Sequence, residues 1–391
     1  MNDTATETVG LRIVADENIP ALQSYFGDLG TLQRCPGRTL SREQLVEADI
    51  LLVRSVTKVN QSLLQGTPVR FVGSCAIGTD HLDIPWLERN GIHWCAAPGC
   101  NANSVVEYVF CALAALEVDW RGRSFGIVGC GNVGGLLQKR LHALGASCAV
   151  YDPWLPDNPD SATLAQALGR DIVCLHAPLI KGGCFPSLHM IGSEQLAHIR
   201  DGAVLISAGR GAVVDNRALL QQLRRERRFS TVLDVWENEP EINTELLQRV
   251  DLATPHIAGY SDDGKLAGTR QIREGLSAVM DLALPAVAPE ASGDTATIRI
   301  VPGSLMNSCE ADPGTGQGGA IADLLLQMYD PRVDDRRLRE AAFGTEPMAQ
   351  VFDRLRREYP KRLEFCHYTG PAEALSEEEL QQLAVLGLMC K

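Results

Sequence analysis

The chain lacks the patterns that mark membrane, secreted and nucleic-acid-binding proteins. None of its apolar runs approaches the roughly 18 to 20 residues of a membrane-spanning helix. The polar stretch Met1–Gly10 has neither a basic region nor an apolar core, so we expect no secretory signal and a cytoplasmic location. The formal net charge of −13 opposes binding to polyanions, which requires a basic surface. We therefore predict that neither nucleic acid nor a membrane is a partner.

Cysteine is plentiful, but its spacing indicates no cysteine-based site. The 12 cysteines include no CxxC pair, and none of them is grouped with histidine at the spacing of a structural zinc site. Disulfide frameworks belong mainly to small secreted domains. We expect reduced, mostly buried thiols and no metal.

Short apolar runs alternate with helical patterns over the first two thirds of the chain. This alternation predicts an α/β protein with parallel sheets, and the number of runs is compatible with two sheets. Several runs are apolar throughout, as expected of strands that helices cover on both faces. A length of 391 residues allows two or three domains. The predicted strands are Leu11–Asp16, Ile50–Ser55, Arg70–Cys75, Phe125–Gly129, Cys148–Asp152, Asp171–Ala177, Ala203–Ala208 and Thr231–Trp236.

Two further features divide the chain. The stretch Asn101–Val118 has an apolar stripe at helical spacing and precedes a basic turn, which is typical of a long helix connecting two domains. After Leu284 the composition shifts to Pro, Ala, Gly and Ser, and helical patterns resume near Ile321. We expect a third, smaller domain there.

A glycine-rich turn predicts the cofactor. The apolar strand Phe125–Gly129 runs into a GxGxxG sequence that opens a helical pattern. In this context the first glycine permits a tight turn, the second lets the backbone approach a pyrophosphate, and the third lets helix pack closely on strand. A methyltransferase-type turn, or a turn used only for packing, is the alternative. The turn residues assigned to the cofactor are Gly129, Gly131, Asn132, Val133 and Gly134.

An acidic residue favours NAD among the nucleotide cofactors. Asp152 ends the next predicted strand, 18 residues beyond Gly134. A carboxylate there accepts hydrogen bonds from the adenosine ribose and repels a 2′-phosphate. We therefore predict NAD and not NADP.

Three polar residues follow predicted strands, at the sheet edge where α/β proteins bind ligands. Arg210 lies between glycines, and its guanidinium suits a substrate carboxylate. His256 has the ordinary pKa to take a hydroxyl proton as a hydride leaves the neighbouring carbon. Glu239 could hold that imidazole in one tautomer. Alone, Arg210 is equally consistent with a surface residue in a turn, and a single histidine is more often a structural residue. The combination with the cofactor site favours catalysis of hydride transfer.

With these residues in hand, the chain resembles the D-2-hydroxyacid dehydrogenases from about Leu11 to Arg270. In having Tyr260 after Gly259, the chain resembles one branch of that family. The substrate of that branch is a small phosphorylated 2-hydroxy acid. The motifs that carry the resemblance are Asp16-Glu-Asn-Ile-Pro20, Val53-Arg-Ser-Val-Thr-Lys-Val-Asn60, Ala97-Pro-Gly-Cys-Asn101, Val105-Val-Glu-Tyr-Val-Phe110, Arg210-Gly-Ala-Val-Val-Asp-Asn216 and His256-Ile-Ala-Gly-Tyr260.

The resemblance implies roles for individual positions. Arg210, Glu239 and His256 are the implied active-site residues, with His256 the proton carrier. Ser55 and Tyr260 are implied to touch substrate, and at Ala76 the family has a threonine whose hydroxyl this chain lacks. Arg54 is our added candidate for the phosphate or carboxylate. The implied NAD contacts outside the glycine turn are Asp152, Ala177, Ala208, Gly209, Asp234 and Gly259.

The resemblance also implies a domain plan: two Rossmann-like, doubly wound parallel-sheet domains with an interdomain cleft, plus a small C-terminal α+β domain that supports a homodimer. The substrate domain is expected at residues 1–100 and 257–285, the NAD-binding domain at 101–256 and the dimerisation domain at 286–391. Two alternative functions stay open. One is another D-2-hydroxyacid dehydrogenase, such as one acting on 3-phosphoglycerate, and the other is a noncatalytic NAD-sensing corepressor on the same scaffold.

Overall fold

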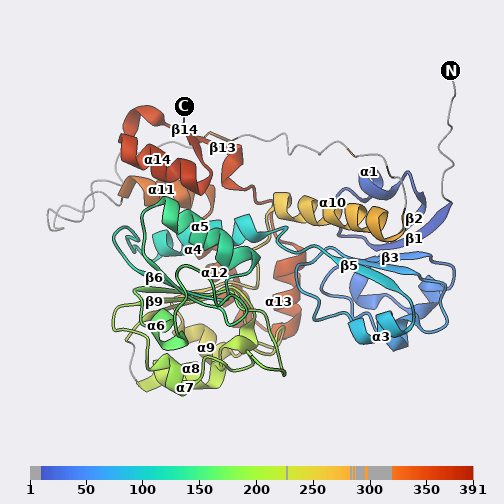
Figure 1. Cartoon of the computed structure of the whole chain (residues 1–391), viewed down its shortest axis with the longest axis horizontal. Helices are drawn as coiled ribbons and strands as arrows, with labels where there is room; N and C mark the ends of the chain where they lie inside the picture. Colours follow the sequence, from blue (N-terminus) through green and yellow to red (C-terminus); the bar gives the residue numbers. More distant parts are fainter. Residues whose placement is uncertain are drawn as a thin grey trace. The chain divides into compact units, whose positions relative to one another are not determined.

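A computed structural model describes residues 10–225, 228–281, 284, 287, 296–297 and 319–390. The chain divides into two compact units, shown in Figure 1. The first comprises residues 1–101 and 262–292, and the second comprises residues 102–261 and 293–391. Each unit is therefore built from two separate stretches of sequence.

The first unit contains a five-stranded parallel sheet of order β2-β1-β3-β4-β5. Its central strands β3 and β4 are buried along their whole length, as expected where helices cover both faces of a parallel sheet. The long helix α10 packs against β4, β5 and α1, so the sequence returns to this unit after the second sheet. The elements are β1 (Leu11–Asp16), α1 (Leu22–Phe26), β2 (Gly30–Cys35), β3 (Ile50–Val53), α2 (Gln61–Leu64), β4 (Phe71–Ser74), α3 (Ile84–Arg89), β5 (His93–Ala96) and α10 (Asp262–Val279).

The second unit contains a six-stranded parallel sheet of order β11-β10-β9-β8-β6-β7. Strands β6, β8 and β9 are buried throughout and form its centre. The elements are α4 (Ala102–Ala115), β6 (Phe125–Val128), α5 (Asn132–Ala143), β7 (Cys148–Tyr151), α6 (Leu164–Leu168), β8 (Ile172–Leu175), α7 (Ser193–Leu196), β9 (Val204–Ser207), α8 (Asn216–Arg225), β10 (Ser230–Leu233), α9 (Thr244–Arg249) and β11 (Leu252–Ala253).

The C-terminal stretch packs onto this second sheet. Helix α12 contacts β11, α9 and α4, while α11 packs against α4 and α14 against α5. Buried side chains such as Leu338 and Phe352 share a hydrophobic cluster with Leu233 and Trp236 of the sheet region. Its elements are β12 (Ala296–Thr297), α11 (Gly319–Met328), α12 (Pro331–Ala342), α13 (Met348–Arg357), β13 (Tyr368–Gly370), α14 (Glu377–Leu386) and β14 (Met389–Cys390).

The predicted fold class is confirmed: two parallel α/β sheets and a small C-terminal part with helices and short strands. The long connecting helix is shorter than predicted, since it ends at Ala115. All eleven cysteines among the described residues carry free thiols, four of them on buried residues. Within the same residues, none of the helices combines the length and the apolarity needed to cross a bilayer.

Candidate active site

The candidate cofactor and catalytic residues of the second unit gather at one edge of its sheet. Because all six strands are parallel, their carboxyl ends lie at the same edge. The glycine turn follows β6, Asp152 follows β7, and Ala177 lies shortly after β8. Ala208 and Gly209 follow β9, Asp234 follows β10, and the loop containing His256 and Gly259 follows β11. The loops after six strands thus lie at one end of the sheet, which is where parallel α/β sheets bind ligands.

Each glycine of the GxGxxG sequence has the environment that nucleotide binding requires. Gly129 has φ +85°, and a Cβ there would lie 2.5 Å from the backbone of Ala177. A Cβ on Gly134 would lie 2.1 Å from the carbonyl oxygen of Gly129, so only glycine permits this close packing. A Cβ on Gly131 would meet nothing within 4 Å. Gly131 precedes α5, whose first two residues are Asn132 and Val133, so open space lies beside a helix N-terminus suited to phosphate.

The carboxylate of Asp152 is held next to this turn. Its Oδ2 accepts a hydrogen bond from the backbone N–H of Cys130 at 2.8 Å, and its Oδ1 accepts one from Trp154 at 3.0 Å. These bonds fix the acidic group beside the turn. The glycine turn therefore fits the pyrophosphate of a nucleotide cofactor, and the carboxylate of Asp152 fits its ribose.

One polar residue at this edge was missed by sequence reasoning. His176 lies between β8 and Ala177, and both of its ring nitrogens are buried without a hydrogen-bond partner among the described residues. Burial lowers the pKa of His176 to about 4, because the charged imidazolium would lose its hydration. The ring is therefore neutral at physiological pH.

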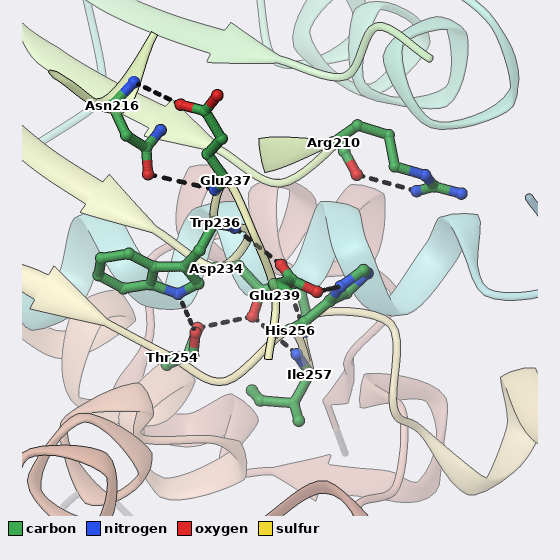
Figure 2. A network of polar contacts seen from close by, with 11 residues as sticks. Arg210, Asn216, Asp234, Trp236, Glu237, Glu239, Thr254, His256 and Ile257 are labelled. Carbon is green, nitrogen blue, oxygen red and sulfur yellow. Dashed lines mark hydrogen bonds and ion pairs between the residues drawn. The ribbon is translucent and has the colours of Figure 1, made fainter. Parts of the chain in front are cut away.

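Glu239 and His256 form a direct pair, shown in Figure 2. The Nδ1 atom of His256 lies 2.7 Å from Oε2 of Glu239. The other carboxylate oxygen, Oε1, accepts a hydrogen bond from the backbone N–H of Trp236 at 2.7 Å. Burial would raise the pKa of Glu239, but the positive charges of His256 and Arg356 and these hydrogen bonds outweigh it and lower the pKa. Glu239 is thus an oriented carboxylate.

Asp234 organises the loop that carries His256. Its buried carboxylate accepts hydrogen bonds from the Thr254 hydroxyl at 2.6 Å, from the Ile257 N–H at 2.7 Å and from the Ala258 N–H at 3.1 Å. Burial raises the pKa of Asp234. His256 itself has φ +57°, a left-handed conformation that is uncommon outside glycine and that the surrounding bonds must maintain.

Arg210 comes from the neighbouring loop, after β9. Its Nη1 donates a hydrogen bond to the carbonyl oxygen of Gly209 at 2.9 Å. The next residue, Gly211, packs so tightly that a Cβ would lie 2.0 Å from the carbonyl of Trp236, which ties the Arg210 loop to the segment containing Glu239. Figure 2 shows the guanidinium of Arg210 and the ring of His256 projecting toward the same side. The three predicted catalytic residues therefore lie on adjoining loops.

Comparison with known proteins places the chain in a family. The model of the D-isomer specific 2-hydroxyacid dehydrogenase NAD-binding domain matches residues 111–258, and a domain of unknown function (DUF3410) matches residues 301–387. An erythronate-4-phosphate dehydrogenase of Cellvibrio japonicus is 48% identical over 97% of this chain and 100% of its own length. The chain belongs to the erythronate-4-phosphate dehydrogenase family. A second member, from Marinobacter nauticus, is 46% identical over 90% of this chain and 92% of its own length.

Membership of the erythronate-4-phosphate dehydrogenase family confirms two predictions from the sequence, an NAD cofactor and a dehydrogenase. Solved structures support the fold. NAD-bound 3-phosphoglycerate dehydrogenase of Entamoeba histolytica superposes with a TM-score of 0.61 at 20% identity, covering 71% of this chain and 98% of that one. D-lactate dehydrogenase of Aquifex aeolicus gives 0.58 at 23% identity, covering 69% and 96%.

The predicted substrate residues of the first unit lie at the ends of its strands. Arg54 follows β3, and its Nε donates to Oδ2 of the buried Asp16 at 3.1 Å. Ser55 is exposed beside it, and Ala76 lies just after β4. The nearby Ser74 is fully buried, with its hydroxyl 2.8 Å from Nε2 of His81. Ser74 is therefore not an exposed replacement for the threonine hydroxyl that the resemblance implies at position 76.

The C-terminal stretch of this family member also touches the His256 loop. Arg362 is buried and donates hydrogen bonds to the carbonyl oxygens of Ala258 at 3.0 Å and Ser104 at 2.8 Å, with a longer one of 3.4 Å to Ile257. Its guanidinium also lies 3.9 Å from the centre of the Tyr329 ring. More than 100 residues separate Arg362 from this loop, so the sequence carried no signal for the contact.

One cluster among the described residues has the composition of a metal site. Single ligand atoms of His142, Cys148 and Asp160 lie within 4.8 Å of one another, at the end of β7 opposite Asp152. Burial raises the pKa of the Cys148 thiol to about 12, which disfavours the thiolate that a metal needs. The imidazole Nε2 of His142 lies 2.6 Å from Asp160. That the enzyme uses no metal stays a prediction.

Proposed function

We propose that this chain oxidises 4-phospho-D-erythronate at C2 to (R)-3-hydroxy-2-oxo-4-phosphooxybutanoate, with NAD as acceptor, in pyridoxal 5′-phosphate biosynthesis. The observation that carries the proposal is the Glu239–His256 pair, 2.7 Å apart, at the sheet edge that also carries the glycine turn and Asp152. The names of relatives at 48% and 46% identity support the substrate. The proposal also assigns NAD contacts to Ala177, Ala208, Gly209, Asp234 and Gly259.

The pair is suited to moving one proton. Glu239 is a carboxylate, so the Nδ1 of His256 carries a hydrogen and donates it to Oε2. The Nε2 atom is then the nitrogen that accepts the proton of the substrate C2 hydroxyl. As the imidazolium forms, Glu239 stabilises its positive charge without taking the proton.

Two further groups complete the proposed mechanism. NAD, when bound, supplies the acceptor for the hydride that leaves C2. Arg210 binds the substrate carboxylate with its planar guanidinium and so fixes which carbon is oxidised. Arg54, Ser55, Ala76 and Tyr260 are the proposed substrate contacts, with a methyl group at position 76 in place of a hydroxyl.

The direct test is the rate of NADH formation by the purified full-length chain. We expect 4-phospho-D-erythronate to be the best substrate in a panel that includes 3-phosphoglycerate and D-lactate. Equal or faster turnover of either of these compounds would reject the assignment. Inactivity toward the whole panel, with NAD still bound, would favour a noncatalytic NAD sensor.

A second measurement tests the proton carrier. We expect His256→Ala to lower kcat by orders of magnitude while the Kd for NAD changes little, because His256 acts on the hydroxyl proton. An active variant would remove His256 from the mechanism.

We further propose a homodimer in the cytoplasm. The family resemblance supports both statements, and the C-terminal stretch is the part proposed to support the dimer. Light scattering on the purified protein tests the first, and fractionation of cells that express it tests the second.

A further inference from the structure

Arg356 is a cation that the C-terminal stretch brings to the candidate active site. It lies in the last turn of α13, where the buried residues Val351, Phe352 and Leu355 fix the helix against the core of the second unit. Its Cζ lies 5.4 Å from the centre of the Tyr260 ring and 5.9 Å from that of Phe352. Tyr260 is one of the proposed substrate contacts.

The guanidinium is electrostatically coupled to the catalytic pair. Burial alone would lower the pKa of Arg356. The electrostatic interaction and side-chain hydrogen bond with Tyr260, together with the carboxylates of Glu239 and Asp234, outweigh burial and raise the pKa. In return, Arg356 is one of the charges that lower the pKa of Glu239. The charge of Arg356 therefore acts on the carboxylate that lies 2.7 Å from His256.

No carboxylate among the described residues lies within ion-pair distance of Arg356, unlike its neighbours on the same helix. Arg354 pairs with Glu346 at 2.7 Å, and Arg357 pairs with Glu358 at 2.9 Å. The Nε of Arg356 is buried and has no hydrogen-bond partner within the described part of the chain. A charged, partly buried guanidinium that keeps an unused donor is suited to an anionic ligand.

The proposed substrate needs such a cation. It carries a carboxylate, which Arg210 is proposed to bind, and a phosphate at the other end. Arg54, the other candidate for the phosphate, already donates to the buried Asp16. Four bonds separate C2 from phosphorus, so the phosphate reaches about 5 Å beyond the reacting carbon.

We propose that Arg356 binds the phosphate group of the substrate beside Tyr260. This inference rests on the proposed function and adds a phosphate subsite to it. The C-terminal stretch then contributes directly to substrate choice, because it supplies the cation that distinguishes a phosphorylated 2-hydroxy acid from an unphosphorylated one.

The test compares 4-phospho-D-erythronate with D-erythronate in the full-length enzyme at saturating NAD. We expect Arg356→Met to raise KM for the phosphorylated substrate about 10- to 100-fold, the range for losing a hydrogen bond to a charged group, and to leave KM for D-erythronate within about twofold. Inorganic phosphate should inhibit the wild-type enzyme competitively and the variant far less. Arg357→Met, which changes an exposed neighbour in the same turn, is the matched control.

The outcomes separate this inference from the proposed function. If the wild-type enzyme does not prefer 4-phospho-D-erythronate, the proposed function fails, and calorimetry with inorganic phosphate then decides whether Arg356 binds it. If the wild-type enzyme has the preference and Arg356→Met keeps it, only the Arg356 subsite is rejected. Equal losses on both substrates would also reject it, since Arg356 would then act through Glu239. Should Arg356→Met fail to fold, Arg356→Lys carries the test, with an expected rise in KM of about tenfold that is confined to the phosphorylated substrate.

Discussion

The Nδ1 atom of His256 and Oε2 of Glu239 lie 2.7 Å apart, although 17 residues separate them in the sequence. The backbone N–H of Trp236 donates a hydrogen bond to the other carboxylate oxygen of Glu239 and so orients that side chain. Asp234 accepts three hydrogen bonds, from residues 254, 257 and 258, and so orders the loop that carries His256. Both His256 and Glu239 are therefore held in place by the loops that follow β10 and β11.

This pair leads to a prediction about Glu239. We expect Glu239→Gln to lower kcat by roughly 100- to 10,000-fold, because the amide is uncharged and cannot stabilise the imidazolium. KM for NAD should change little. The control is Glu237→Gln, which removes a carboxylate of the same loop that contacts His189 and Asn216. Equal losses in the two variants would contradict a specific role for Glu239.

Two alanine substitutions in the glycine turn should affect different properties, NAD affinity in one case and stability in the other. Gly131→Ala places a Cβ in open space, so the free energy of unfolding should stay within about 0.5 kcal/mol while the Kd for NAD rises at least tenfold. Gly134→Ala places a Cβ 2.1 Å from the Gly129 carbonyl oxygen and should destabilise the fold by about 1 to 3 kcal/mol. Denaturant unfolding and NAD titration measure both quantities. Unchanged NAD affinity in Gly131→Ala would argue against a pyrophosphate at that position.

Asp152 is expected to set the choice between NAD and NADP. Replacing it by serine removes the ribose acceptor and the charge that repels a 2′-phosphate, so KM for NAD should rise about 10- to 100-fold and KM for NADP should fall. Asp157→Asn, at an exposed position in the same loop, serves as the control. An Asp152→Ser variant that still discriminates fully against NADP would show that another residue sets the preference.

The neutral His176 predicts how stability depends on pH. Its pKa is about 4 in the folded chain and about 6.5 when exposed, so the unfolded state binds more protons between these values. The contribution of neutral His176 is complete above pH 6.5 and is lost as the pH falls, by about 2 kcal/mol at pH 5.

Denaturant unfolding at pH 7.5 and pH 5 measures this loss. We expect His176→Asn to lose about 2 kcal/mol less than the wild-type chain over that interval, because the variant lacks the titrating ring. Identical pH profiles would show that the pKa of His176 is not lowered in the folded state.

The sequence predicted the parts of the fold that depend on local apolar patterns. β1 was predicted with the bounds Leu11–Asp16 that the structure has, because its centre Ile13–Ala15 is a short apolar run of the kind that a buried parallel strand has. Strand β2, Gly30–Cys35, was missed because it is the outermost strand of its sheet and exposes most of its polar residues, so it has no apolar run. β11 has only two residues, too few to give a pattern.

The same distinction holds for the site. Glycine spacing and strand ends indicated the turn, Asp152 and Arg210, which closely follow β6, β7 and β9. Glu239 and His256 lie in longer loops and were indicated by their side-chain chemistry and by the family resemblance. Arg356 and Arg362 could not be found in this way. They belong to helical or irregular sequence about 100 residues beyond the loop that they contact, and only the packing of the C-terminal stretch on the second sheet brings them there.

The hydrogen bonds of Arg362 tie the C-terminal stretch to the loop that carries His256, so we expect the proposed proton transfer to depend on that stretch. A recombinant protein that stopped near residue 285 would retain every strand of the NAD-binding sheet and the whole glycine turn. It would nevertheless leave the carbonyls of Ile257 and Ala258 without their guanidinium, next to a histidine held at positive φ. We expect such a shortened enzyme to lose stability as well as turnover, because its second unit would also lose buried side chains such as Leu338 and Phe352.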